Sequence, residues 1–239
     1  MARVTEGRIG TGRRGALPTG FAFTAFAAYR AVNTPASLPV EARPAISASA
    51  LRTLASAPRV MLRGTYDTWG YRYDTHILIW LVAPAPDPLQ NALAAFGRTP
   101  LAGALEPSWT AIGVRHDRDW PAWDEPAYFT GQPALRYLCV SPVVRKAAWY
   151  SLALADQRRL TTESLQVARR YPDVQRSRAT AVGLPEGDGL LALESDELVR
   201  IMELIRELKL APEGRYVGNE LPFITGVRRP LAEILDALP

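Results

Sequence analysis

Cysteine is almost absent from this sequence: Cys139 is the only one among 239 residues. A single cysteine forms no internal disulfide and no thiolate metal cluster, which fits a protein of the reducing cytoplasm. Long apolar runs are missing too, and none approaches the roughly 20 residues that a membrane-spanning helix needs. Residues 2–19 carry glycines and arginines where a secretory signal would be apolar. We therefore expect a cytoplasmic protein with no membrane contact.

A strong excess of one charge is also missing. The chain has 28 lysines and arginines against 24 aspartates and glutamates, a formal net charge of +4. Several of the arginines lie in residues 1–19, which we expect to be a disordered tail. Because no basic stripe or stacking aromatic motif accompanies the charge, the sequence does not predict a nucleic-acid partner.

Histidine is scarce, with only His76 and His116 in the chain. The two are far apart in the sequence and form no recognised metal-ligand spacing, so we predict no metal site. His76 alternates with Asp74, Leu78 and Trp80 on a predicted strand, where a histidine satisfied by its neighbours is the simplest interpretation. His116 stands beside Asp117 and Asp119, and these residues form either a solvated cluster of salt links or part of a metal site.

The sequence is rich in apolar residues, whose 48% share is enough to bury a substantial core. Between residues 20 and 116, apolar periodicity and turn residues predict the element order β-α-β-β-α-β. The strands are expected at 21–32, 59–66, 73–83 and 108–115, and the helices at 45–57 and 87–96.

The same order returns after a linker, 117–133, that is rich in Asp, Trp and Pro. Over residues 134–239 the pattern predicts strands at 135–142, 174–182, 189–193 and 221–225, and helices at 155–170 and 196–208. The predicted fold class is therefore α+β. Two fused ferredoxin-like units whose sheets close together into a dimeric-type α+β barrel are the simplest architecture.

Short motifs follow one another in a fixed order along the chain. They include RGTYD at 63–67, LEP at 105–107, RYLCV at 136–140, YPDV at 171–174 and PFITG at 222–226. In sequence and spacing they resemble motifs of the chlorite dismutase / coproheme decarboxylase family, in the branch that uses a distal histidine. The resemblance covers roughly residues 20–228. It implies the doubled α+β barrel of that family and a homo-oligomer, commonly a pentamer.

The same resemblance places three chemical positions of the family on different residue types. Ser164, seven residues before Tyr171, stands where a histidine would hold haem iron. Ser141 stands where a tyrosine would carry oxidising equivalents, and Asp124 where the distal histidine would be. A serine hydroxyl is a poor iron ligand beside imidazole or thiolate. The sequence therefore predicts no cofactor, and in particular no haem.

An altered pocket of this kind suits a small-molecule substrate, because serines leave room and hydroxyl groups among apolar residues. Asp124 is the candidate general base, and Ser141 and Arg145 complete the predicted catalytic set. Arginine can bind a carboxylate through two parallel hydrogen bonds. The predicted substrate-binding residues are Ser164, Arg169, Tyr171, Glu194 and His76.

Each assignment has a structural alternative. Asp124 is also suited to a turn or helix cap before Pro126, and the arginines to internal salt bridges. Glu194 matches the acidic residue that orients the iron-binding histidine of the family. It either pairs with Ser164 or is retained by packing. Cys139 could replace the iron ligand but is more simply a small buried residue.

Three functions follow from this interpretation. The first is a haem-independent enzyme that acts on a small organic substrate in specialised, natural-product biosynthesis. The second is a non-catalytic binding or regulatory subunit of the family. The third retains haem or coproporphyrin as a weakly held ligand.

Overall fold

The computed structural model describes residues 21–32, 38–116, 124–182, 188–218 and 220–238. The predicted tail, 1–19, and the first part of the predicted linker, 117–123, lie outside these residues. Within them, no helix combines the length and the apolar character that crossing a membrane requires.

The N-terminal half has the predicted order β-α-β-β-α-β. The third strand is buried along its whole length because its alternate side chains face two apolar layers, Leu81 toward the helices and Trp80 toward the barrel interior. The elements are β1 (Phe21–Ala31), η1 (Val40–Ala42), α2 (Arg43–Ala55), β2 (Met61–Asp67), β3 (Ile77–Ala83), α3 (Pro86–Phe96), η2 (Ala102–Ala104) and β4 (Leu105–His116).

The C-terminal half repeats that order, as predicted, and adds helices that the sequence did not predict. The additions are the short α4, the 3-10 helix η5 and the final helix α7, and the last strand begins later than predicted. The elements are β5 (Tyr137–Val143), α4 (Ala147–Tyr150), α5 (Leu154–Ala168), β6 (Gln175–Ala181), β7 (Gly189–Ser195), α6 (Leu198–Leu210), η5 (Pro212–Tyr216), β8 (Ile224–Arg228) and α7 (Leu231–Ala237).

The strands close into one barrel in the order β1-β3-β2-β8-β5-β7-β6-β4. Numbered within its own half, each set of four strands has the same order, 4-1-3-2. The halves join through short pairings of β2 with β8 and of β4 with β6. At the second junction a Cβ on Gly113 would lie 2.7 Å from the Cβ of Ala179, so only glycine allows this approach. The predicted α+β barrel is confirmed.

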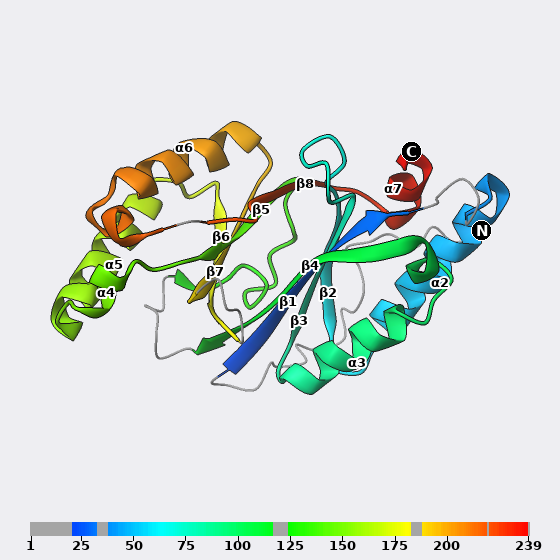
Figure 1. Cartoon of the computed structure of the whole chain (residues 1–239), viewed down its shortest axis with the longest axis horizontal. Coiled ribbons are helices and arrows are strands. Elements are labelled where there is room, and N and C mark those ends of the chain that lie inside the picture. Colours follow the sequence, from blue (N-terminus) through cyan, green and yellow to red (C-terminus); the bar gives the residue numbers. More distant parts are fainter. Residues whose placement is uncertain (1–20, 33–37, 117–123, 183–187, 219, 239) are drawn as a thin grey trace.

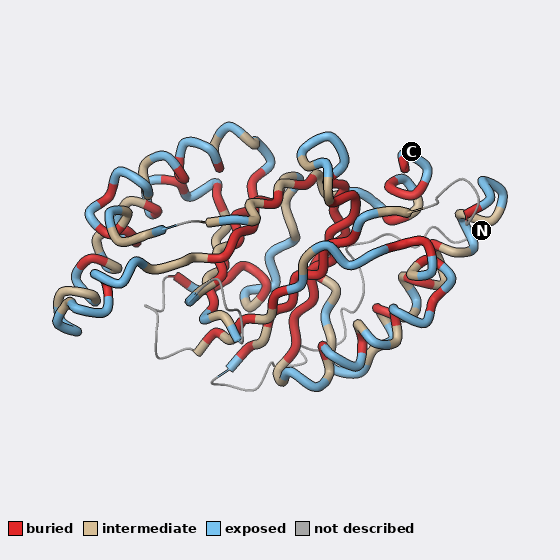
Figure 2. Tube along the Cα trace, in the orientation of Figure 1, coloured by how far each residue is buried: buried red, intermediate tan, exposed pale blue. Residues whose placement is uncertain are grey.

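Three apolar cores fill the molecule. One lies inside the barrel, and one lies between each half of the sheet and its helices. The helices α2 and α3 cover the N-terminal half and α5 and α6 cover the C-terminal half (Figure 1), while buried residues follow the strands between them (Figure 2). Helix α7 packs against α2 in the N-terminal core. The domain boundaries at 116 and 134 stay a prediction.

Candidate functional site

A pocket lies on the helix-facing side of the C-terminal sheet, where β5, β6 and β7 face α6 and η5. It contains about 920 Å³ of empty space, part of which is open to solvent. Its walls are mostly apolar and include Val143, Leu190, Leu191, Ile205, Leu208, Val217 and Phe223. A pocket of this size and lining can hold an organic molecule.

Polar side chains from separate elements meet in the same pocket. Ser141 comes from β5, Ser164 from α5, Arg178 from β6 and Glu213 from η5, and Arg145 follows β5 directly. Ser141, Ser164 and Glu213 are buried. A few convergent polar groups in an otherwise apolar pocket can fix the orientation of a ligand.

The carboxylate of Glu213 is central to this polar group. Its Oε1 accepts hydrogen bonds from the guanidinium of Arg145 and, at 3.3 Å, from the hydroxyl of Thr161. Burial raises the pKa of Glu213, but the charges of Arg178 and Arg145, with a hydrogen bond from Arg145, bring it below its ordinary value. Glu213 is therefore ionised at neutral pH.

Two guanidinium groups face Glu213. Arg145 lies over the ring of Trp149, 4.1 Å from its centroid. Burial lowers the pKa of Arg178, and the carboxylates of Glu213 and Asp124 act in the opposite direction. Because an arginine keeps its charge in proteins, both groups are cationic. Two cations beside apolar walls suit an organic anion such as a carboxylate.

Glu213 reaches the pocket because the chain turns sharply after α6. The 3-10 helix η5 approaches the end of α6 so closely that a Cβ on Gly214 would lie 2.4 Å from the carbonyl oxygen of Lys209 and 2.8 Å from that of Leu208. Pro212 occupies the first position of η5. The local sequence Pro-Glu-Gly therefore turns the chain and points its glutamate inward.

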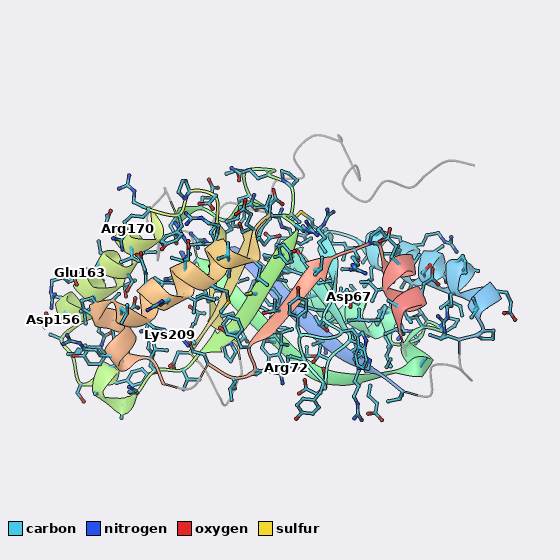
Figure 3. The ribbon with its side chains drawn as sticks, turned by 90° about the horizontal axis from the view of Figure 1, so that it is seen from above. Asp67, Arg72, Asp156, Glu163, Arg170 and Lys209 are labelled. Atoms are coloured by element: carbon cyan, nitrogen blue, oxygen red, sulfur yellow. The ribbon has the colours of Figure 1, made fainter. Side chains whose placement is uncertain are left out.

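A third cation lines the pocket from α6. Lys209, labelled in Figure 3, has its Nζ 3.1 Å from Oε2 of Glu220, which also lines the pocket. The side chain of Lys209 is largely exposed and that of Glu220 is mostly buried. Lys209 can therefore meet a second anionic group of a ligand at the solvent side.

Of the eight predicted site residues, Ser141, Arg145 and Ser164 line the pocket. Asp124 is buried nearby but does not line it. Its Oδ1 accepts a hydrogen bond of 3.0 Å from Arg176, and its main-chain oxygen accepts one from Arg115. Its contribution to the pocket in this structure is electrostatic, through Arg178.

Glu194 lies inside the barrel, away from Ser164. Its Oε2 accepts hydrogen bonds from Nε and Nη2 of Arg63, at 3.1 and 2.7 Å, and its Oε1 accepts one of 3.1 Å from the hydroxyl of Tyr66. Burial raises the pKa of Glu194, although Arg63 and Tyr66 oppose the shift. The structure thus does not form the predicted pair of Ser164 and Glu194, since the two side chains lie on opposite faces of the sheet.

The other predicted residues also lie outside the pocket lining. His76 is in the N-terminal half, where its Nδ1 accepts a hydrogen bond of 3.0 Å from the main-chain N–H of Ala31. Tyr171 lies under the guanidinium of Arg200, and Arg169 donates to Gln166 on its own helix. In the described ranges, no three or more His, Cys, Asp and Glu side chains gather as metal ligands would.

Cys139 is buried beside Thr225, whose hydroxyl is 3.2 Å from its sulfur. Burial raises the pKa of its thiol to about 11, although the hydrogen bond with Thr225 opposes the shift. The thiol therefore stays protonated, as expected of a small buried residue rather than an iron ligand.

Sequence reasoning missed Arg178, Lys209 and Glu213. Arg176 and Arg178 alternate on a predicted strand, and two arginines on the same face imply carboxylate partners if that face is buried. The Pro-Glu-Gly sequence after α6 marks a sharp turn. These signals are present in the sequence, but only the fold brings Arg178 and Glu213 together.

Comparison with known proteins identifies the family. The sequence model of the family described as chlorite dismutase matches residues 43–229. The coproheme decarboxylase of Mycolicibacterium smegmatis is 33% identical over 181 residues, which are 75% of this chain and 78% of that protein. The chain belongs to the chlorite dismutase family. A structure of the chlorite dismutase from Candidatus Nitrospira defluvii in complex with imidazole superposes with a TM-score of 0.77, at 22% identity, over 91% of this chain and 94% of that one.

Family membership corrects the prediction about cofactors. We predicted no haem because Ser164 stands at the position of the iron-binding histidine. The prediction is wrong, because the relative at 33% identity is named for its action on coproheme, an iron porphyrin. A serine at position 164 does not by itself exclude a porphyrin.

Proposed function

We propose that this member of the chlorite dismutase family is an enzyme that binds an organic substrate with carboxylate groups, of the coproheme type, in the pocket beside α6 and η5. The observation that carries the proposal is the meeting of Arg145 and Arg178 in a pocket whose walls are mostly apolar. A porphyrin with propionate groups combines a large apolar ring with anions at its edge, and this pocket offers a complementary surface.

The residues of the pocket fit the parts of such a molecule. Leu191, Ile205 and Phe223 supply apolar contacts for a ring. Arg145 and Arg178 can bind one carboxylate, and Lys209 can meet another at the solvent side. The described lining contains no histidine, cysteine, methionine or tyrosine, so a protein ligand to iron from this lining would be an oxygen or the amine of Lys209. A bound haem would supply redox chemistry.

A smaller organic acid is the second candidate substrate. The serines at positions 141 and 164 support it, because both hydroxyl groups line the pocket where the resemblance implies larger side chains. Natural-product biosynthesis stays a prediction for this candidate. Binding without turnover of either ligand class would instead favour the regulatory subunit.

The test is a titration of the purified chain with coproheme, followed by the change in porphyrin absorbance. Arg145→Met should weaken binding roughly 10- to 100-fold, because a hydrogen bond to a charged group contributes about 1.5–3 kcal/mol. Arg159→Met is the matched control, since Arg159 is exposed on α5 and pairs only with Asp156 and Glu163 in the described structure. Equal affinity of Arg145→Met and the control would exclude this pocket as the binding site.

The assembly and location of the protein also stay proposals. We propose a homopentamer in the cytoplasm, on the strength of the family resemblance. Light scattering after size-exclusion chromatography should give five times the mass of one chain. A monomer or dimer at micromolar concentration would contradict this assembly.

A further inference from the structure

The carboxylate of Glu213 already occupies the place that suits a ligand carboxylate. It accepts a hydrogen bond from Arg145 and is held by the charge of Arg178, the same two cations that the proposed function assigns to a substrate. Glu213 is buried and lies on a short 3-10 helix rather than inside the barrel. A substrate anion would therefore meet a carboxylate of the protein at its own binding site.

The groups around Glu213 come from several elements of the C-terminal half. The segment after β5 contributes Arg145, and β6 contributes Arg178. Helix α5 contributes the uncharged hydroxyl groups of Thr161 and Ser164. From α6 the charged residue of the pocket is Lys209, which pairs with Glu220. Asp188 lines the pocket and accepts a hydrogen bond from the main-chain N–H of Arg145.

Two carboxylates cannot both remain ionised at low cost beside one pair of cations. In the structure the arginines lower the pKa of Glu213 by more than burial raises it. When a ligand carboxylate binds the same arginines, they stabilise the ionised form of Glu213 less. The ligand also brings a second negative charge close to Glu213. Burial and repulsion then both favour the protonated form of Glu213.

We propose that Glu213 is a resident competitor for the carboxylate site, and that an organic anion displaces it from Arg145 while Glu213 takes up one proton from solvent. This inference rests on the proposed function and deepens it, because it couples substrate binding to protonation. The charge balance is simple: one carboxylate enters, one carboxylate becomes a carboxylic acid, and no bond in the ligand changes. The acid that forms lies beside Ser164.

The test measures proton uptake with zinc coproporphyrin III, a tetracarboxylate whose ring nitrogens hold zinc and do not titrate. Isothermal titration calorimetry near pH 6, in two buffers that differ in ionisation enthalpy, gives the protons taken up per ligand. Wild-type protein should take up about one proton, and its affinity should fall about tenfold per pH unit wherever uptake is complete. Glu213→Gln should take up none, bind more tightly than wild type near pH 7, and show a flat pH profile.

The control is Glu163→Gln, because Glu163 precedes Ser164 but lies on the exposed side of α5 and pairs with Arg159. It should behave as wild type. Tight binding by wild-type protein without proton uptake overturns the inference and leaves the proposed function standing. This outcome is measured on wild-type protein alone, so it does not depend on whether a variant folds. Undiminished uptake by Glu213→Gln also overturns it. If wild-type protein does not bind the porphyrin at all, the proposed function fails and the inference fails with it.

Discussion

The two halves of the barrel have the same strand order but differ in what lies between sheet and helices. In the N-terminal half this layer is an apolar core, to which α7 adds Leu231, Ile234 and Leu235. In the C-terminal half the apolar cluster is smaller, and the pocket with Arg145, Arg178 and Glu213 lies beside it. One topology thus supports a closed core in one half and a binding site in the other. The difference lies in the side chains on the helix-facing strand positions and in one added helix.

The largest expected effect comes from the charge pair inside the barrel, which joins the halves. Glu194→Ala leaves the buried guanidinium of Arg63 without its carboxylate, so we expect a loss of about 3–5 kcal/mol in the free energy of unfolding. Glu106→Ala is the control, because the pair of Arg30 and Glu106 is exposed and contributes about 0–1 kcal/mol. Chemical denaturation measures both. Equal losses would mean that the interior pair does not hold the halves together.

A pair of leucine variants tests the contrast between the helix layers directly. Leu81→Ala opens a cavity in the closed N-terminal core and should cost about 2–5 kcal/mol. Leu191→Ala removes part of a wall that already borders empty space, so it should cost about 1–2 kcal/mol and mainly weaken coproheme binding. If Leu191→Ala costs as much stability as Leu81→Ala and leaves affinity unchanged, the two layers are equivalent and the contrast is wrong.

Two glycine variants compare the 3-10 helices of the two halves, η5 beside the pocket and η2 in the N-terminal half. In Gly214→Ala the new methyl group would overlap the carbonyl oxygen of Lys209, so η5 must shift and carry Glu213 with it. We expect a loss of about 1–3 kcal/mol in unfolding free energy and altered coproheme affinity. Gly103→Ala in η2 of the N-terminal half meets nothing within 4 Å and should change stability by less than about 0.5 kcal/mol. If Gly214→Ala binds coproheme with wild-type affinity, the turn at Gly214 does not determine the binding properties of the pocket.

The smallest effect is a pH dependence of stability that belongs to the pocket. The pKa of Glu213 is lower in the folded protein than its ordinary value, so its contribution is present above the ordinary pKa and is lost as the pH falls through the folded pKa. The stability difference between wild type and Glu213→Gln should therefore shrink below about pH 4. Urea denaturation at a series of pH values measures it, with Glu163→Gln as control. A difference that grows toward acid pH would mean that the arginines do not hold Glu213 ionised.

The order of elements and the family could be predicted because both are written in local patterns. Period-two and helical patterns located the strands and helices of both halves, and motifs such as RGTYD and PFITG carried the resemblance. The helix α7 was missed because its three buried residues are too few to stand out from a short apolar segment. Its place became evident only from its packing on α2.

The candidate site was only partly predictable, because sequence spacing does not say which face of a strand a side chain takes. The structure places Ser141, Ser164 and Arg145 in the lining of one pocket. Glu194 was expected near Ser164, but in β7 it alternates with residues that face the helices and so points into the barrel. A shift of one residue along a strand exchanges the two faces.

The sequence by itself indicated the family and the order of the elements. Those properties depend on residue identity and on neighbours along the chain. Only the tertiary structure decided that Asp124 joins Arg115 and Arg176 in ion pairs, and that Arg178 and Glu213 meet Arg145 in the pocket. Burial and pairing of charges depend on residues far apart in the chain, and these become neighbours only when the barrel closes.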